Sequence, residues 1–259
     1  MSAPVTLVAA AKLTFELRIT GVRDDGYHLI DAEMASLSVG DSLTIDPSGD
    51  GVTLSGPYAE GIPTDESNLV RRALALTGRR AHVTIDKRIP PGGGLGGGST
   101  DAAAVLRWSG WGGSADQLVT ASTIGADIPF CIVGGRARVR GIGEIVEPLP
   151  HAARSVTLVI PPLSVDTPAA YRAWDELGGP TADGPNDLEP AACRVEPELV
   201  RWRDRIGDAC GEHPVLAGSG ATWFVPGEHE NALAALGNEG ARIIAAHTTP
   251  PPDPVGSRR

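Results

Sequence analysis

The sequence predicts an α+β fold, in which strands and helices are mixed rather than strictly alternating. Segments 5–20 and 36–46 show the apolar–polar alternation of half-buried strands, whereas 69–78 is an Arg/Ala/Leu segment typical of a helix. A doubly wound parallel sheet needs a regular strand–helix–strand rhythm, which this chain does not show. With 259 residues, the chain is long enough for one large domain or two modest ones.

The first domain is expected to span residues 1–150, because Pro148-Leu149-Pro150 interrupts the pattern of elements. A turn at 21–26 follows the first strand, and Asp65 or Ser67 is a candidate cap for the first helix. In chain order, the domain is expected to contain strands over 5–20 and 36–46, a helix over 69–78, a strand over 81–86, helices over 101–108 and 115–123, and two strands within 131–147.

The second domain is expected to span residues 151–247, and a Pro-rich tail over 248–259 is expected to be disordered. A second glycine turn, Gly218-Ser219-Gly220, lies inside this domain. In chain order, the domain is expected to contain a strand over 155–160, a helix over 168–177, a loop over 178–187, a helix over 196–207, a strand over 221–225 and a helix over 228–237.

Composition excludes several classes of function. A net charge of −10 argues against a general binder of nucleic acid or of anionic membranes, and no apolar run has the length of a membrane span. The apolar segment 5–11 has no basic residue before it and runs directly into Lys12, so it is interpreted as a strand rather than a signal peptide. Cys131, Cys193 and Cys210 show neither metal-site spacing nor a disulfide framework, which predicts a cytoplasmic protein.

A glycine-rich loop between a predicted strand and a predicted helix is the main candidate site. Glycines allow backbone amides to converge on one point, and a helix N-terminus adds partial positive charge, so the loop is expected to hold phosphate. A ligand-free flexible linker is the alternative. The loop consists of Pro91, Gly92, Gly93, Gly94, Leu95, Gly96, Gly97, Gly98, Ser99 and Thr100.

Two familiar phosphate-loop patterns do not fit this loop well. Gly92, Gly94 and Gly97 have the spacing of a dinucleotide-binding GxGxxG, but no acidic residue follows where a ribose would need it. The Gly-Lys-Ser/Thr of a Walker A loop occurs nowhere in the chain. A Rossmann-type oxidoreductase is therefore only a distant alternative for this chain.

Lysine is rare in this chain. Only Lys12 and Lys87 among the 22 basic residues are lysines, and a compact ammonium approaches a single phosphate oxygen in a way that a guanidinium does not. We therefore expect both at a phosphate site, the alternative being chance in an Arg-favouring coding background.

Six motifs together resemble the GHMP small-molecule kinases. The resemblance covers about residues 5–225, and Gly-Tyr-His with Gly-Ala-Asp-Ile-Pro-Phe is similar to the branch that phosphorylates 4-diphosphocytidyl-2-C-methyl-D-erythritol in non-mevalonate isoprenoid synthesis. It implies a domain like domain 2 of ribosomal protein S5, followed by a ferredoxin-like α/β domain. The motifs are Ala11-Lys12-Leu13, Gly26-Tyr27-His28, the glycine-rich loop, Gly125-Ala126-Asp127-Ile128-Pro129-Phe130, Asn186-Asp187-Leu188-Glu189 and Ala217-Gly218-Ser219-Gly220-Ala221.

The resemblance also implies ATP and Mg²⁺ as cofactors and a role for each matching residue. Asp127 would be the catalytic base, with Lys12 beside it orienting the acceptor hydroxyl; the alternative for Asp127 is a cap or turn carboxylate. Ser99 or Thr100 would face phosphate or magnesium. Asn68 and Lys87 would line the adenine pocket, although Asn68 could instead cap its helix.

The partner implied is a small cytidine-diphosphate substrate. Tyr27 and Tyr171 would stack on the two faces of the cytosine, while His28 would bond its edge. The alternatives are that Tyr27 packs its own hairpin and Tyr171 belongs to the core. Further substrate contacts are implied for Thr14, Thr167, Gly218 and Ser219, although the family usually carries Asn where this chain has Thr14.

Two rival functions stay open. The first is a GHMP kinase for another alcohol, such as homoserine or a mevalonate derivative, whose substrate has no base for Tyr27 to stack upon. The second is a non-catalytic, nucleotide-binding paralogue, against which Lys12 and Asp127 argue. The chain is expected to act as a monomer or homodimer, without nucleic-acid or membrane partners.

Overall fold

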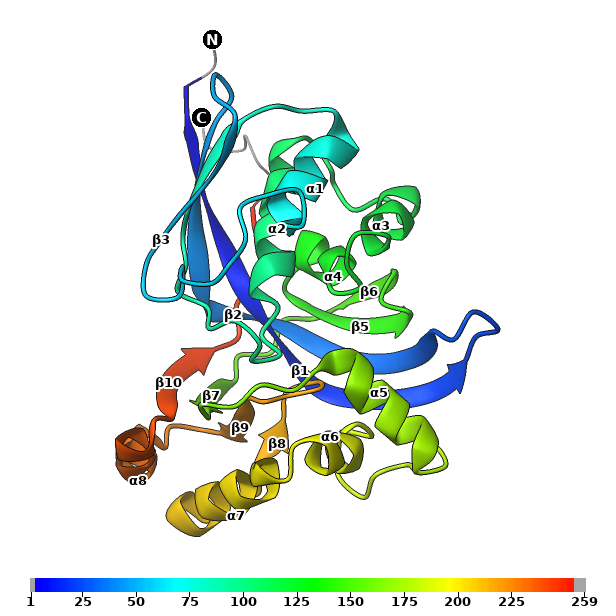
Figure 1. The fold of residues 1–259 in the computed structure, drawn as a ribbon, viewed down its shortest axis with the longest axis vertical. Coiled ribbons are helices and arrows are strands. Elements are labelled where there is room, and N and C mark those ends of the chain that lie inside the picture. The colour runs from blue at the N-terminus through cyan, green and yellow to red at the C-terminus, as the bar shows by residue number, and fades with distance from the viewer. Residues whose placement is uncertain (1–2, 254–259) are drawn as a thin grey trace.

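The computed structural model describes residues 3–253, whose strands form two mainly antiparallel sheets (Figure 1). This arrangement of sheets and helices confirms the predicted α+β class. Strands of the first sheet lie between Val5 and Leu149, and those of the second lie between Ser155 and His247. The domain boundary after Pro150 stays a prediction, and it falls in the connection between the sheets.

Two long paired strands, β1 (Val5–Val22) and β2 (His28–Asp46), form the backbone of the first sheet. Their antiparallel register shifts between Ala10 and Lys12, and such a bulge turns neighbouring side chains to new directions. The consecutive residues 11–14 are accordingly all buried. The other strands are β3 (Gly51–Ser55), β4 (His82–Asp86), β5 (Arg136–Gly141) and β6 (Ile145–Leu149), in the order β3-β4-β2-β5-β6.

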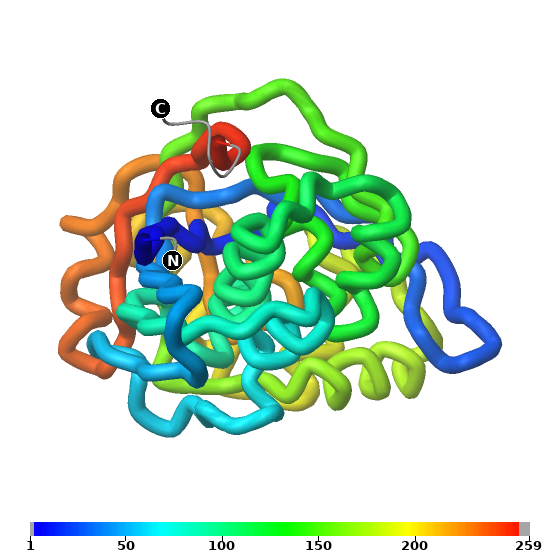
Figure 2. The backbone as a smooth tube through the Cα atoms, turned by 90° about the horizontal axis from the view of Figure 1, so that it is seen from above, coloured from blue at the N-terminus to red at the C-terminus, as the bar shows by residue number. Residues whose placement is uncertain are grey.

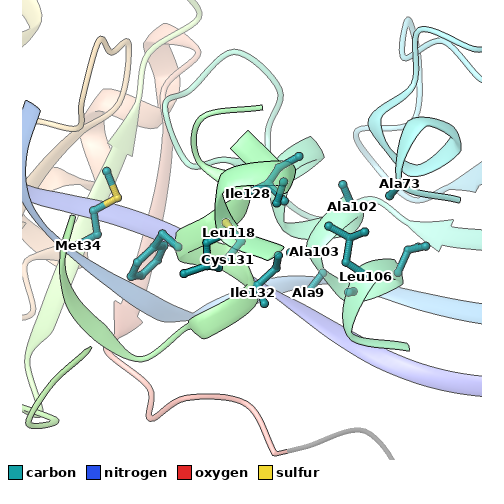
Figure 3. Close-up of a cluster of buried hydrophobic side chains, with 14 of the residues drawn as sticks. Ala9, Met34, Ala73, Ala102, Ala103, Leu106, Leu118, Ile128, Cys131 and Ile132 are labelled. Carbon is teal, nitrogen blue, oxygen red and sulfur yellow. The ribbon is translucent and has the colours of Figure 1, made fainter. Parts of the chain in front are cut away.

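Helices α1 (Leu69–Thr77), α2 (Gly97–Trp108), α3 (Ala115–Ser122) and α4 (Ile128–Val133) lie on one face of this sheet (Figure 1). The small buried residues 102–104 allow α2 to pack closely among its neighbours. Figure 3 shows the resulting core, in which Met34 of β2 and Leu106 of α2 lie with Ile128 and Cys131 of α4.

The second sheet has the order β10-β7-β9-β8 and consists of β7 (Ser155–Ile160), β8 (Val215–Leu216), β9 (Trp223–Pro226) and β10 (Arg242–His247). Its helices are α5 (Thr167–Glu176), α6 (Glu189–Val195), α7 (Glu198–Cys210) and α8 (Glu230–Leu233), which continues as a 3₁₀ turn, Ala234–Glu239. Trp202, Ile206 and Trp223 are buried in a separate core here.

A third apolar cluster joins the two sheets. It combines Leu13 and Leu37 of the first sheet with Leu158 and Phe224 of the second, and it includes Leu95 of the glycine-rich loop. The loop is therefore fixed between the sheets. Figures 1 and 2 show the β1–β2 hairpin projecting at the side of the molecule where α5 lies.

Several elements differ from the predictions. The prediction of a strand at residue 131 is wrong, because Ile128–Val133 forms α4; a short apolar run does not distinguish a strand from a buried helix. Helix α2 begins at Gly97, four residues earlier than expected, because the glycines of the loop continue into it. Strands β3, β8 and β10 and helix α6 were not predicted.

The prediction of a disordered tail is wrong for residues 248–252. Thr248 donates its backbone N–H to the carbonyl of Arg154 (3.0 Å), and Thr249 donates to the carbonyl of Ser36 (2.9 Å). Pro251 and Pro252 then lie against Gly135 and Gly134. Residues 254–259 of the predicted tail lie outside the described part of the chain. Within residues 3–253, no helix has the length and apolar character of a membrane span.

Candidate active site

Two cavities meet at the glycine-rich loop. A cavity of about 340 Å³ lies between the loop, the end of β4 and the start of α1. A larger one, of about 570 Å³, lies between β1, the hairpin, the start of α4, α5 and the Gly218 turn. Gly94 and Ser99 line both, so a group held in one cavity lies next to the contents of the other.

Two glycines of the loop lie so close to neighbouring segments that a side chain would not fit. Gly94 has φ +74°, and a Cβ there would lie 2.4 Å from the carbonyl oxygen of Ala217 in the second glycine turn. Gly96 has φ +70°, and a Cβ there would lie 2.8 Å from Cγ of Lys12. Any side chain at these positions would push the loop away from both the turn and β1.

Strand β1 holds the loop at two points. Lys12 donates its backbone N–H to the carbonyl of Leu95 (3.0 Å), and the Thr100 hydroxyl donates to the carbonyl of Ala10 (2.7 Å). Between these anchors α2 begins at Gly97, where first-turn N–H groups have no intrahelical acceptor and favour an anion. The Thr100 hydroxyl is thereby bonded away from both cavities, whereas Ser99 lines both. Of the two magnesium candidates, the geometry favours Ser99.

Lys12 and Asp127 face each other in the larger cavity. The Lys12 Nζ lies 3.4 Å from Asp127 Oδ2, and the lysine side chain is 6% exposed while the carboxylate is 34% exposed. Asp127 stands at the N-cap of α4, yet its side chain accepts no capping hydrogen bond. The alternative of a capping carboxylate is therefore not supported.

Thr14 and the second glycine turn complete this end of the cavity. Lys12 Nζ donates to the Thr14 hydroxyl (3.3 Å), so the residue that departs from the family pattern still bonds the lysine. The buried Asn186 donates from Nδ2 to the carbonyls of Leu216 (2.9 Å) and Gly218 (2.7 Å), and thereby shapes the turn. The sequence indicates Asn186 only as part of a motif and predicts no role for it.

Tyr27 and His28 line the same cavity from the hairpin, and Tyr171 lines it from α5. His28 and Tyr171 stack at a tilt, with ring centroids 4.7 Å apart, and Tyr27 stands at the hairpin tip with 59% of its surface exposed. The Arg23 guanidinium lies over the Tyr27 ring, 6.0 Å from its centroid, so Tyr27 contacts its own hairpin and also lines the larger cavity. Burial raises the pKa of Tyr171, and the nearby Asp127 carboxylate adds to that effect. Thr167 and Ser219 bond through their hydroxyls (2.7 Å) and close the wall between α5 and the turn.

Lys87 lines the smaller cavity, but its ammonium is already paired. It lies between the buried carboxylates of Asp41 and Asp101, with 2.6 Å between Nζ and Asp101 Oδ2. Asp41 also accepts the backbone N–H groups of Arg88 (2.5 Å) and Ile89 (2.8 Å), where the chain enters the glycine-rich loop. Lys87 therefore braces the loop through these two carboxylates, and its contact with phosphate stays a prediction.

Asn68 lines the smaller cavity and also caps α1. Its Oδ1 accepts from the N–H of Val70 (2.9 Å), and its Nδ2 donates to the carbonyl of Pro63 (2.7 Å). The alternative that Asn68 caps its helix is confirmed, which does not prevent it from forming part of the cavity wall.

Comparison with known proteins identifies the family. The family described as GHMP kinases N terminal domain matches residues 68–135, which include the glycine-rich loop and Asp127. The 4-diphosphocytidyl-2-C-methyl-D-erythritol kinase of Paracoccus denitrificans (strain Pd 1222) is 36% identical over 240 residues, covering 83% of this chain and 84% of that protein. The chain belongs to the 4-diphosphocytidyl-2-C-methyl-D-erythritol kinase family.

Further relatives agree with membership of this kinase family. The enzyme of the same name from Ruegeria pomeroyi is 37% identical over 241 residues, covering 83% of this chain and 86% of that protein. A crystal structure of 4-(cytidine 5'-diphospho)-2C-methyl-D-erythritol kinase matches with a TM-score of 0.75 and 33% identity, covering 95% of this chain and 100% of that one. Homoserine kinase from Cytophaga hutchinsonii, at 20% identity and a TM-score of 0.60, shares the fold.

Most of the predicted site residues of this kinase line one or both of the two cavities. Lys12, Asp127, Thr14, His28 and the Gly218 turn all line the larger cavity. Their individual roles stay predictions. The sequence did not reveal Asp41 and Asp101 as partners of Lys87, because Asp41 reaches it through the pairing of β2 with β4 and Asp101 through the packing of α2. Nor did it reveal Asp175 and Arg172, which line the larger cavity from α5.

Asp101 gives this kinase-family member a testable pH dependence of stability. Burial raises the pKa of Asp101 to about 8; Lys87 opposes the shift and Asp41 reinforces it. Between the unfolded pKa of about 4 and the folded value, the folded state binds more protons, so stability falls as pH rises, by at most about 1.4 kcal/mol per pH unit. The Asp101→Asn variant has no carboxyl group to titrate at this position. Its free energy of unfolding should therefore fall less between pH 5 and pH 8 than that of the wild type.

Urea unfolding of both proteins at pH 5 and pH 8 measures this difference. Asp86→Asn is the matched control, because Asp86 lies near the same strand end but pairs with the exposed Arg88. Equal slopes for the wild type and the Asp101→Asn variant would show that Asp101 titrates normally.

Proposed function

We propose that this protein transfers the γ-phosphoryl group of ATP to the 2-hydroxyl of 4-diphosphocytidyl-2-C-methyl-D-erythritol. One observation carries the proposal: the Lys12–Asp127 pair lies in a cavity that shares Gly94 and Ser99 with the cavity beside the glycine-rich loop. A donor phosphate at the loop and an acceptor hydroxyl at Asp127 would then be neighbours. The names of the relatives supply the identity of the acceptor.

The smaller cavity is assigned to ATP. The loop amides and the first turn of α2 would hold the β- and γ-phosphates, and apolar groups such as Leu54 and Ile85 would pack against the base. Residues 3–253 contain no group of three or more His, Cys, Asp or Glu arranged to bind a metal. Magnesium would therefore bind mainly through the nucleotide phosphates, with Ser99 as the residue nearest to them, and it would neutralise charge on the transferred group.

Asp127 and Lys12 are assigned to the transfer itself. Asp127 would accept the proton of the 2-hydroxyl as the oxygen forms its bond to the γ-phosphorus and the bond to the β-phosphate oxygen breaks, which releases ADP. The Lys12 ammonium, 3.4 Å from that carboxylate, would orient the hydroxyl and stabilise charge that develops on its oxygen. The bond to Thr14 keeps the ammonium in place.

The part of the larger cavity lined by the hairpin and α5 is assigned to the cytidine diphosphate. Tyr27, His28 and Tyr171 would hold the base by stacking and edge contacts. Arg172 lines the same cavity, and its ion pair with Asp166 is long, at 3.6 Å. Its guanidinium would therefore reach the diphosphate. Homoserine or a mevalonate derivative has no cytosine base to bind between Tyr27, His28 and Tyr171.

A panel of acceptor alcohols with γ-labelled ATP tests the assignment. Label should pass to 4-diphosphocytidyl-2-C-methyl-D-erythritol and not to homoserine or mevalonate. Transfer to one of the other alcohols instead would indicate a GHMP kinase of different specificity. ATP binding without transfer to any acceptor would indicate the non-catalytic alternative.

A cytoplasmic location and a monomeric or homodimeric state are further parts of the proposal. Cys131, Cys193 and Cys210 are free thiols, which agrees with a reducing compartment. Sedimentation velocity of the purified protein with and without ATP measures the oligomeric state. A species larger than a dimer would contradict this part of the proposal.

A further inference from the structure

Helix α5 surrounds His28 with three side chains. Tyr171 stacks on the imidazole, Trp174 meets it edge-on with ring centroids 5.6 Å apart, and Asp175 Oδ1 lies 2.9 Å from its Nε2. Trp174 is itself fixed, because its Nε1 donates to the carbonyl of Pro180 (2.9 Å). The His28 side chain is only 10% exposed, so its ring orientation is set by these contacts.

The hydrogen bond to Asp175 determines the tautomer of His28. An ionised carboxylate only accepts hydrogen bonds, so Nε2 must carry the proton. In the neutral ring the other nitrogen, Nδ1, then has a lone pair and acts as an acceptor. No hydrogen bond to Nδ1 is found within residues 3–253, and both His28 and Asp175 line the larger cavity.

We infer that Asp175 is a specificity-determining residue that makes the acceptor cavity select cytosine over uracil. By holding the proton on Nε2 of His28, it leaves Nδ1 to accept a hydrogen bond from the exocyclic amine of cytosine. Uracil presents a carbonyl oxygen at that position, and two acceptors facing each other cannot bond. The inference rests on the proposed function. Asp175 acts through His28, and so it is a positioning residue rather than a catalytic one.

A pair of matched acceptors tests this inference. The two substrates are the cytidine-diphosphate and uridine-diphosphate derivatives of the same methylerythritol. The wild type should prefer the cytidine compound by at least about tenfold in kcat/KM. The amide of the Asp175→Asn variant can either accept a hydrogen bond from Nε2 or donate one to it, so it no longer fixes the tautomer. In this variant the ratio of the two kcat/KM values should fall toward one. The change should appear in KM for the acceptor, with the KM for ATP unchanged.

Glu176→Gln is the matched control, because it removes the same charge from the next residue of α5, where Glu176 pairs with Arg194 at 3.7 Å rather than with His28. This variant should keep the wild-type preference. An unchanged preference in Asp175→Asn, or an equal loss in Glu176→Gln, would overturn the inference. Turnover of neither compound by the wild type would instead overturn the proposed function.

Nitrogen-15 NMR of the histidine side chains gives a readout that does not depend on turnover. His28 should show the Nε2–H tautomer in the wild type and in Glu176→Gln, and a shift toward the Nδ1–H form in Asp175→Asn. An Nδ1–H tautomer in the wild type would overturn the inference even if the kinetic preference were present.

Discussion

Replacement of Asp127 by Asn is expected to lower kcat by about 10²–10⁴-fold, the contribution typical of a general base. The amide has nearly the shape of the carboxylate but cannot take the proton of the acceptor hydroxyl. The side chain makes no capping hydrogen bond to α4, so the substitution should leave the start of that helix unchanged, and any loss of stability would come from removing the charge opposite Lys12. The KM for ATP should stay unchanged, because Asp127 lines the acceptor cavity and not the one beside α1.

Steady-state kinetics with both substrates, together with a thermal unfolding scan, measures this effect. Asp116→Asn is the control, since Asp116 is an exposed carboxylate in the first turn of α3, outside both cavities. It should behave as the wild type does. Retention of more than about a tenth of kcat in Asp127→Asn would remove Asp127 from the role of base, and an equal loss in Asp116→Asn would point to a general effect of charge.

Replacement of Lys87 by Met is expected to destabilise the fold by about 3–5 kcal/mol, because it breaks a buried ion pair by removing one partner. Asp41 and Asp101 would then face each other in a buried site without a cation. Asp41 also accepts two backbone N–H groups at the entrance to the glycine-rich loop, so the disturbance should reach the loop and raise the KM for ATP.

Urea unfolding at pH 7 measures the stability, and adding Asp101→Asn tests the explanation. The double variant Lys87→Met/Asp101→Asn should recover part of the loss, because the second substitution removes one of the two acids. Arg88→Met is the control, since Arg88 pairs with Asp86 at the surface and should change stability by less than about 1 kcal/mol. A similarly small effect of Lys87→Met would show that the buried cluster does not need its cation.

The sequence predicted those helices and strands that are determined by neighbouring residues. The alternation in β1 and β4, the Asn68 position before α1 and the glycines before α2 all follow from backbone preferences of neighbouring residues. The apolar run that forms α4 was misjudged, since burial removes the polar residues that would reveal a helical period. Strands β3 and β10 were missed, because their stability depends on pairing with β4 and β7 rather than on their own sequence.

In the candidate site, too, residues with a local sequence signal were predicted, and residues defined by contacts between distant segments were not. Lys12, Asp127 and the glycine-rich loop were found through motifs, and the structure brings them together. The partners of Lys87 and of His28 were not found, because Asp41 lies 46 residues from Lys87 and Asp175 lies 147 residues from His28. Such pairs depend on strand register and helix packing, which a single sequence does not display.

The contact of Gly94 with the second glycine turn has a consequence for the synthesis of this protein. The glycine-rich loop and Asp127 leave the ribosome well before Ala217 and Gly218, against which the loop closes. Since domains form in the order in which they are made, the first sheet can fold while the acceptor cavity still lacks a wall. A nascent chain that stops before residue 217 should therefore have a folded half without a transfer site.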